Sequence, residues 1–225
     1  MERRNAGKLI TFRRTGRIPM ATRVFLVRHG ETEWNAARRY QGHHDVPLSP
    51  AGERQAERLA LRLMREKFAA VYTSDLSRAV ATARAIARPH GVPVVQLREL
   101  REIDVGEWEG MSFDELERAR PADVARWLED TVNNPIPGGE SYASLRDRVV
   151  PKVMELVRAH PDASFCVVSH AGPVKMVLCD ALGIALESRH RIDLANASLC
   201  AVEYSPGRAP RVLFMNDTCH LHLLT

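Results

Sequence analysis

Two histidines in this chain of 225 residues each follow a short apolar run that is rich in β-branched residues. Arg28-His29-Gly30 comes directly after residues 24–27, and His170 ends another such run. A neutral imidazole is a nucleophile. An adjacent guanidinium disfavours protonation of the ring and binds phosphoryl oxygens through paired N–H groups. Glycine lets the backbone turn sharply and lets a phosphate approach closely. This arrangement is compatible with phosphoryl transfer through a histidine, but Arg-His-Gly alone is weak evidence because three residues recur by chance.

Strands and helices are predicted to alternate along the chain. Strands are expected at residues 24–27, 69–72, 92–97 and 165–169, with an antiparallel edge hairpin at 198–204 and 211–214. Helices are expected at residues 50–67, 76–88, 121–130, 141–159 and 172–182, with a further one opening at Ser112. This order predicts a three-layer α/β/α domain with a mostly parallel central sheet. Ligands bind beyond the carboxyl ends of such strands, so His29 and His170 are expected on the binding side.

Three local features add to these expectations. Thr73-Ser74-Asp75 can cap the helix that follows it. Residues 98–110 carry two glycines and little periodicity, which predicts a loop. Pro151 lies inside the predicted 141–159 helix and is expected to kink or break it.

Longer strings carry a more specific signal than the single tripeptide. They are VFLVRHGETEWN (24–35), QGHHDVPLSPAGERQA (41–56), SDLSRAVATA (74–83), LREIDVGEWEG (100–110), PGGES (137–141) and VVSHAGPVK (167–175). In this order they resemble the motifs of the histidine phosphatase superfamily, also called the phosphoglycerate mutase-like family. The resemblance runs from about residue 22 to the end of the chain. With the first two strings taken as one motif, five motifs in order make a chance match improbable.

The resemblance implies a role for each of five residues. His29 aligns with the phospho-accepting histidine, and Arg28 and Arg78 align with the two arginines that clamp the phosphate. His170 aligns with the second histidine of the phosphate pocket. Glu102 aligns with the proton donor, and its motif position favours it over the nearby Glu99.

Further pocket positions follow from the same resemblance. Asn35, Gln41 and Gly42 match substrate-binding positions, and Ala171 stands where the family usually has glycine. Pro173 has no backbone N–H, so it cannot donate a hydrogen bond to a phosphate. Four residues near the motifs can form an apolar pocket wall or pack in the core, and the sequence leaves both open: Trp34, Trp108, Met111 and Tyr142.

Three activities are compatible with these motifs. Glu102 and His170 are 68 positions apart, which is shorter than in the cofactor-dependent mutases of the family. The short form resembles the branch of broad-specificity and ribazole-phosphate phosphatases. We therefore expect a phosphatase that acts on a small phosphorylated metabolite. The alternatives are a phosphoglycerate mutase and a non-catalytic phosphoester-binding module.

The charge distribution and the lengths of the apolar runs indicate which kinds of partner are expected. The net charge is +4, but residues 1–19 hold six basic residues and one acidic residue, so the remainder is at −1. Residues 1–19 are expected to be a disordered basic extension, and 20–225 a single histidine phosphatase domain. This distribution argues against a nucleic-acid partner, and no apolar run is long enough for a membrane span. The resemblance leaves a homodimer open.

The spacing of the cysteines and histidines indicates the cellular compartment and whether a metal or cofactor is expected. The four cysteines lack CxxC spacing and there is no secretory signal, which favours a reducing, cytoplasmic location. His43-His44-Asp45 offers no third convergent ligand within its loop, so no metal site is expected. No cofactor is required, since guanidinium and imidazole groups can supply the positive charge that phosphoryl transfer needs.

Overall fold

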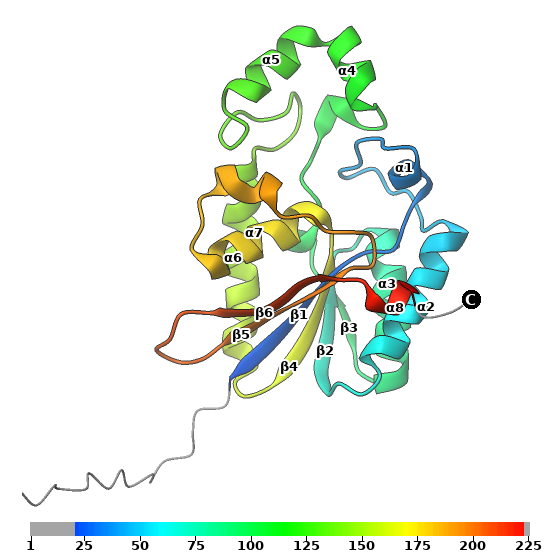
Figure 1. Cartoon of the computed structure of the whole chain (residues 1–225), viewed down its shortest axis with the longest axis vertical. Coiled ribbons are helices and arrows are strands. Elements are labelled where there is room, and N and C mark those ends of the chain that lie inside the picture. The colour runs from blue at the N-terminus through cyan, green and yellow to red at the C-terminus, as the bar shows by residue number, and fades with distance from the viewer. Residues whose placement is uncertain (1–20, 223–225) are drawn as a thin grey trace, which may run out of the picture.

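The centre of the molecule is a six-stranded sheet in the order β3-β2-β4-β1-β5-β6, in a computed structural model that describes residues 21–222 (Figure 1). The strands are β1 (Thr22–Arg28), β2 (Phe68–Thr73), β3 (Val94–Gln96), β4 (Ser164–Ser169), β5 (Leu199–Tyr204) and β6 (Arg211–Asp217). The first four are parallel to one another, whereas β5 pairs antiparallel with β1 and β6 antiparallel with β5. The mostly parallel sheet and the antiparallel edge hairpin are thus confirmed.

Helices cover both faces of this sheet. They are α1 (Glu33–Ala36), α2 (Pro50–Leu63), α3 (Ser77–Ala87), α4 (Phe113–Ala119), α5 (Pro121–Glu129), α6 (Tyr142–Ala159), α7 (Ala171–Leu182) and α8 (Cys219–His222). Short 3-10 helices are η1 (Arg88–His90), η2 (Arg98–Leu100), η3 (Gly106–Trp108) and η4 (Leu186–Arg191). Helices α6 and α7 lie on one face and α2, α3 and α8 on the other, which confirms the three layers (Figure 1). Helices α4 and α5 project beyond the carboxyl ends of the parallel strands (Figure 1).

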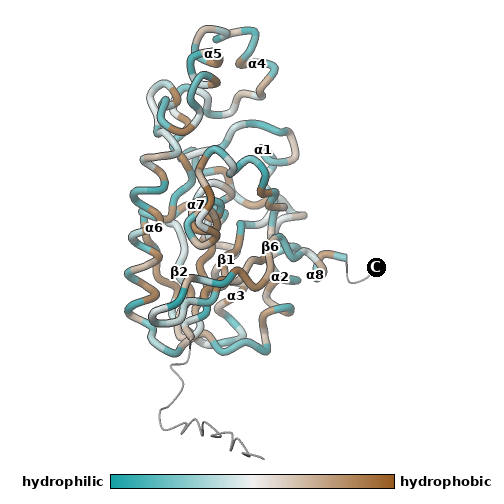
Figure 2. Tube along the Cα trace, turned by 60° about the vertical axis from the view of Figure 1, so that its left-hand side comes forward, coloured by the Kyte–Doolittle hydropathy of each residue, from teal (hydrophilic) through white to brown (hydrophobic). Residues whose placement is uncertain are grey.

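The central strand β1 is apolar on both sides because both of its faces are covered. Val24 and Leu26 belong to the core cluster that contains residues of α6 and α7. Phe25 and Val27 belong to the cluster that contains residues of α2 and α3. Figure 2 shows hydropathy changing from turn to turn along α6, as expected of a helix with one buried side. These two clusters fix the direction and register of β1, and therefore the position of the residue that follows it.

Several predicted boundaries differ from the structure. Helix α6 continues through Pro151, so the expected break there is wrong. Pro151 is on the exposed side of the helix, where water can satisfy the carbonyl that loses its partner, while Val149 and Val153 stay buried. The predicted third strand is shorter, and the predicted loop at 98–110 contains η2 and η3. Helix α3 has Leu76 as its N-cap, without a side-chain cap.

Three further expectations concern the N-terminal extension, a membrane span and the cysteines. The basic extension predicted at residues 1–19 lies outside the described residues. Between residues 21 and 222, no helix is long and apolar enough to cross a membrane. The four cysteines are free thiols, of which Cys166, Cys179 and Cys200 are buried and Cys219 is exposed.

Candidate active site

His29 follows β1 at the carboxyl end of the sheet. Its backbone N–H donates to Ser169 O of β4 at 2.9 Å, and the residue is only 3% exposed. The ring Nδ1 lies 2.7 Å from Gly30 O. A carbonyl oxygen can only accept a hydrogen bond, so Nδ1 carries the proton and Nε2 of a neutral ring carries a lone pair. The hydrogen bond therefore sets the tautomer that an attacking Nε2 needs.

The surroundings of His29 keep its ring uncharged. Burial lowers the pKa of His29 well below its ordinary value of 6.5, and the guanidinium groups of Arg78 and Arg28 lower it further. The hydrogen bond to Gly30 O raises the pKa, but by less than burial and the two guanidinium groups lower it. A neutral imidazole between two cations is suited to attack an anionic phosphoryl group.

The turn after His29 depends on a glycine and a threonine. Gly30 N donates to Thr82 Oγ1 at 3.1 Å, and the same hydroxyl donates to Arg78 O at 2.9 Å. A Cβ on Gly30 would lie 2.5 Å from Gly52 O, closer than real Cβ contacts allow. Gly30 is therefore required because the backbone of α2 approaches it closely.

Arg78 lies fully buried on α3 and its guanidinium is held on three sides. Nη1 donates to His44 O at 2.9 Å, Nη2 donates to Gly42 O at 2.7 Å, and Nε donates to His170 Nδ1 at 3.3 Å. Burial lowers the pKa of Arg78 to about 10, against the influence of Glu102 and other nearby carboxylates. The group stays protonated at neutral pH and keeps two N–H groups for a ligand.

His170 follows β4 and is fully buried beside His29. The two rings have centroids 5.0 Å apart and meet edge to face at 64°. Because Nδ1 accepts from Arg78, Nε2 carries the proton and donates to Ser74 Oγ at 2.7 Å. Burial and the nearby Arg78 hold the pKa of His170 well below its ordinary value. The structure thus brings His29, Arg78 and His170 together, with Ser74 as a partner that sequence reasoning assigned to a helix cap.

Glu102 reaches this group from the loop after η2. Its Oε1 accepts hydrogen bonds from Ile103 N at 2.9 Å and from Gly172 N at 3.1 Å, and Gly172 N also lies 3.2 Å from Oε2. Gly172 is in the first turn of α7, where the helix dipole favours a negative charge. A Cβ on Gly172 would collide with Glu102 Oε1 and lie 3.0 Å from Leu145 Cδ2.

The rival carboxylate, Glu99, has a different environment. Its side chain is 42% exposed and pairs with Lys152 at 3.3 Å. A backbone hydrogen bond and Lys152 lower the pKa of Glu99. Glu102 is the carboxylate that lies against α7, so the structure favours it over Glu99 for contact with the site.

Arg148 of α6 holds the loop that carries Glu102. Its Nη1 donates to Glu99 O and Arg101 O at 2.8 Å each, and its Nη2 donates to Glu102 O at 2.7 Å. Its Nε and Nη2 also pair with the Glu140 carboxylate at 2.8 Å. This role could not be predicted, because the acceptors are backbone carbonyls more than 40 positions away in the sequence.

The predicted pocket residues Asn35 and Gln41 are linked to each other. Asn35 Nδ2 donates to Gln41 Oε1 at 3.4 Å, and Asn196 Nδ2 donates to Asn35 Oδ1 at 2.9 Å and to His29 O at 3.3 Å. Asn196 was not predicted. The buried Gln41 Nε2 has no hydrogen-bond partner among the described residues. Such a donor is suited to a ligand oxygen.

Arg28 is the remaining predicted cation. Its Nη1 donates to Leu194 O at 2.6 Å, while the buried Nε has no partner within residues 21–222. Burial lowers the pKa of Arg28, and Glu102 raises it. Arg28 therefore also has a donor available to an anion.

A cavity of about 140 Å³ opens beside Glu102. Gln41, Ala171 and Gly172 also line it, together with Tyr142. Tyr142 is one of the four residues expected either in an apolar pocket wall or in the core. The other three, Trp34, Trp108 and Met111, do not line this cavity. Trp108 is fully buried in the core, Met111 packs against the same cluster, and Trp34 stacks on His44 with centroids 4.8 Å apart.

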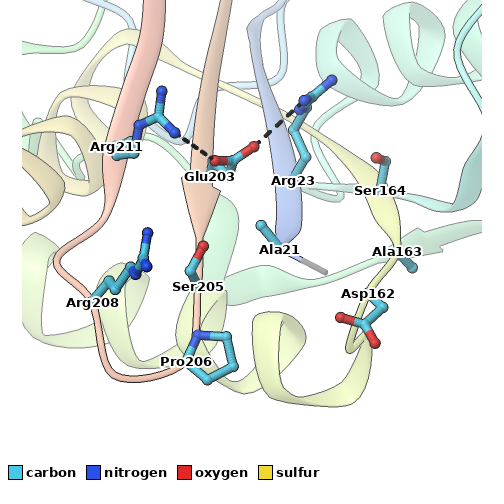
Figure 3. A pocket seen from close by; sticks show the side chains of 10 residues that line it. All are labelled: Ala21, Arg23, Asp162, Ala163, Ser164, Glu203, Ser205, Pro206, Arg208 and Arg211. Carbon is cyan, nitrogen blue, oxygen red and sulfur yellow. Dashed lines mark hydrogen bonds and ion pairs between the residues drawn. The ribbon is translucent and has the colours of Figure 1, made fainter. Parts of the chain in front are cut away.

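A larger cavity of about 720 Å³ lies at the opposite end of β1 (Figure 3). Arg23 and Arg211 line it, and both pair with Glu203, at 3.5 Å and 3.3 Å (Figure 3). Since His29 follows the other end of the strand, this cavity is remote from the candidate chemistry.

The side chains of the His43-His44-Asp45 segment have interactions other than metal binding. His43 Nε2 lies 3.0 Å from Glu102 O, His44 stacks on Trp34, and Asp45 accepts from Ser77 N at 2.7 Å. In the part of the chain that the structure describes, no group of three or more His, Cys, Asp or Glu residues could hold a metal ion.

Fold and site together define an α/β enzyme of phosphoryl transfer. A family model described as the histidine phosphatase superfamily (branch 1) matches residues 24–218. The chain therefore belongs to that superfamily, as the motifs predicted.

Individual relatives agree with this assignment. Phosphoserine phosphatase 1 of Hydrogenobacter thermophilus is 37% identical over 199 residues, covering 88% of this chain and 94% of the relative. A probable phosphoglycerate mutase GpmB of Serratia proteamaculans is 36% identical over 181 residues, covering 80% and 84%. The crystal structure of a putative alpha-ribazole-5'-P phosphatase from Escherichia coli superposes with a TM-score of 0.81 at 27% identity, covering 88% and 97%.

Proposed function

We propose that this protein hydrolyses phosphomonoesters of small metabolites through a covalent phosphohistidine on His29. The observation that carries the proposal is the tautomer and charge of that ring. Nδ1 is bonded to Gly30 O, and burial with two guanidinium groups keeps the pKa low, which leaves the Nε2 lone pair free to attack. The 37% identity to a phosphoserine phosphatase supports hydrolysis as the outcome.

In the first step His29 Nε2 attacks phosphorus, and the bond from phosphorus to the ester oxygen breaks. Glu102, in its protonated form, donates its proton to the leaving oxygen. In the second step the Glu102 carboxylate takes a proton from water, whose oxygen attacks phosphorus and releases inorganic phosphate. The phosphorus–nitrogen bond breaks with its electron pair returning to His29, so the enzyme is regenerated.

The cations stabilise the transferring group. Arg78 and Arg28 donate to the equatorial oxygens, as in other phosphoryl-transfer sites. His170 can join them through Nδ1 only in its other tautomer, in which Nδ1 no longer accepts the hydrogen bond from Arg78 Nε. Ser74 permits this exchange, since its hydroxyl can donate to Nε2 as well as accept from it.

A mutase activity is the second candidate, favoured by the 36% identity to a probable phosphoglycerate mutase. A mutase returns the phosphoryl group to a bound acid, whereas a phosphatase transfers it to water. Incubation with 3-phosphoglycerate separates the two, because hydrolysis releases inorganic phosphate and isomerisation yields 2-phosphoglycerate.

Turnover of p-nitrophenyl phosphate in the presence of EDTA tests the proposal. We expect wild-type protein to release nitrophenol under these conditions and His29→Ala to lose the activity. A wild type that binds vanadate without turning over any phosphomonoester would instead be a non-catalytic phosphoester-binding module.

A further inference from the structure

Lys175 lies in the cavity beside Glu102 and has no role in the chemistry proposed above. It is half-buried on α7 and lines the cavity of about 140 Å³ with Ala171 and Gly172. Lys175 follows Ala171 by four positions, so both lie on the same side of the helix. A lysine on this side reaches the cavity from the wall next to Glu102.

The ammonium group of Lys175 has no ion-pair or hydrogen-bond partner among residues 21–222. Asp193 and Glu102 are the carboxylates that favour its charge, and Arg28 and Arg189 oppose it. Asp193 is exposed and beyond ion-pair distance, and Glu102 accepts from backbone N–H groups. Burial lowers the pKa of Lys175. A half-buried cation without a counter-charge is costly, and an anionic ligand removes that cost.

Apart from Glu102 and the Gln41 amide, the rest of the cavity is mainly aromatic and apolar. Tyr40, Trp127, Ile136 and Tyr142 contribute aromatic and apolar surface to it. The leaving group of a substrate must lie next to Glu102, its proposed proton donor, and therefore at this small space, whose walls carry Lys175 and Gln41 among mostly aromatic and apolar side chains. An anionic group on the leaving alcohol would meet Lys175 directly.

We propose that Lys175 binds a carboxylate on the leaving-group side of the substrate, so that the preferred substrates are short phosphorylated carboxylic acids. This inference rests on the proposed phosphatase function and adds a specificity-determining residue to it. The carboxylate would form a charge-assisted hydrogen bond with Nζ, the interaction that the isolated ammonium lacks.

A matched pair of substrates tests this assignment. Glycerol 3-phosphate differs from 3-phosphoglycerate only by a hydroxymethyl group in place of the carboxylate. We expect wild-type kcat/KM, measured as phosphate release, to be about 10- to 100-fold higher for 3-phosphoglycerate. Lys175→Met should bring the ratio close to one, whereas Lys175→Arg should keep most of the preference. Lys67→Met, at an exposed lysine between α2 and β2, should leave the ratio unchanged.

The outcomes separate this inference from the proposed function. Wild-type protein that turns over p-nitrophenyl phosphate but treats the two substrates equally would overturn the role of Lys175 alone. The same holds if Lys175→Met lowers both rates by the same factor, because the lysine would then have a general role. If wild type hydrolyses no phosphomonoester, the proposed function itself fails.

Discussion

The Glu102 carboxylate lies 3.1 Å from the backbone nitrogen of Gly172, in the first turn of α7. No side chain larger than hydrogen fits at position 172, because its Cβ would occupy the place of Glu102 Oε1. The glycine therefore allows the proposed acid to lie against the helix that begins after His170. This relationship links the acid motif to the second-histidine motif.

Gly172→Ala should displace Glu102 and lower kcat by about 10²- to 10³-fold, within the usual range for loss of a general acid. The loss should be larger for alkyl phosphates, whose leaving group needs a proton, than for p-nitrophenyl phosphate. Steady-state kinetics on both substrates checks this. In a Glu102→Gln background, Gly172→Ala should lower kcat only slightly, because the carboxyl group that it displaces is already absent. Equal losses in the two backgrounds would show that Gly172 does not act through Glu102.

Arg148→Met should weaken the support of the Glu102 loop and lower kcat about tenfold or more, with a smaller change in KM. The reason is that Arg148 donates to three backbone carbonyls in and directly after η2, those of Glu99, Arg101 and Glu102. Arg148 is a positioning residue, so alkyl phosphates should again be affected more than p-nitrophenyl phosphate.

A matched control is available on the same helix. Arg146 pairs with Asp147 on the surface at 2.6 Å and does not contact the loop, so Arg146→Met should retain wild-type kinetics. If Arg146→Met and Arg148→Met behave alike, or if Arg148→Met affects both substrate types equally, the positioning role is wrong.

Arg78→Lys should weaken binding of phosphate and vanadate by about 10- to 100-fold. A lysine keeps the charge but cannot donate to Gly42 O, His44 O and His170 while also presenting paired donors to an anion. Competitive inhibition constants measure the effect. Arg84→Lys, at an exposed position of α3, is the control and should bind both anions normally. Unchanged inhibition of Arg78→Lys would remove this arginine from the phosphate site.

The buried histidines should make stability depend on pH. His29 and His170 stay neutral in the folded protein at pH values where an unfolded chain, with an ordinary pKa of 6.5, binds protons. The unfolded state then holds more protons, so the free energy of unfolding falls as pH drops below about 6.5, by up to about 1.4 kcal/mol per pH unit for each histidine. Above about pH 7.5 both states are neutral at these residues, and their contribution no longer changes.

Urea unfolding at pH 7.5, 6.5 and 5.5 checks this dependence. Between pH 6.5 and 5.5, His29→Gln and His170→Gln should each make the free energy of unfolding less dependent on pH. The decrease in slope should equal the contribution of the one histidine that was removed. A slope that is identical in wild type and in both variants would show that these rings are not held neutral.

Much of the fold could be predicted because β1 and β4 are apolar on both faces, which is typical of parallel strands covered by helices. The motif strings placed His29, Arg78, Glu102 and His170, and the structure brings them to one end of the sheet. Pro151 was misleading, since its effect depends on which side of α6 faces solvent. The spacing of Leu145, Val149 and Val153 contains that information, but the predicted break rested on Pro151 alone.

The supporting residues could not be predicted for a different reason. Ser74, Thr82, Arg148 and Asn196 act through hydrogen bonds to segments distant in sequence, often to backbone carbonyls that carry no sequence signal. Ser74 also matched the pattern of a helix cap before α3. Because that local role explained the residue, its hydrogen bond to His170 was not predicted.

The most direct measurement is rapid quench of the wild-type enzyme with ³²P-labelled substrate, followed by acid and alkali treatment and peptide mapping. We expect a phosphorylated protein that is labile in acid and stable in alkali, with the label on His29 and none on His29→Ala. If turnover proceeds while no such species accumulates at any quench time, or if the label maps elsewhere, transfer through His29 is contradicted.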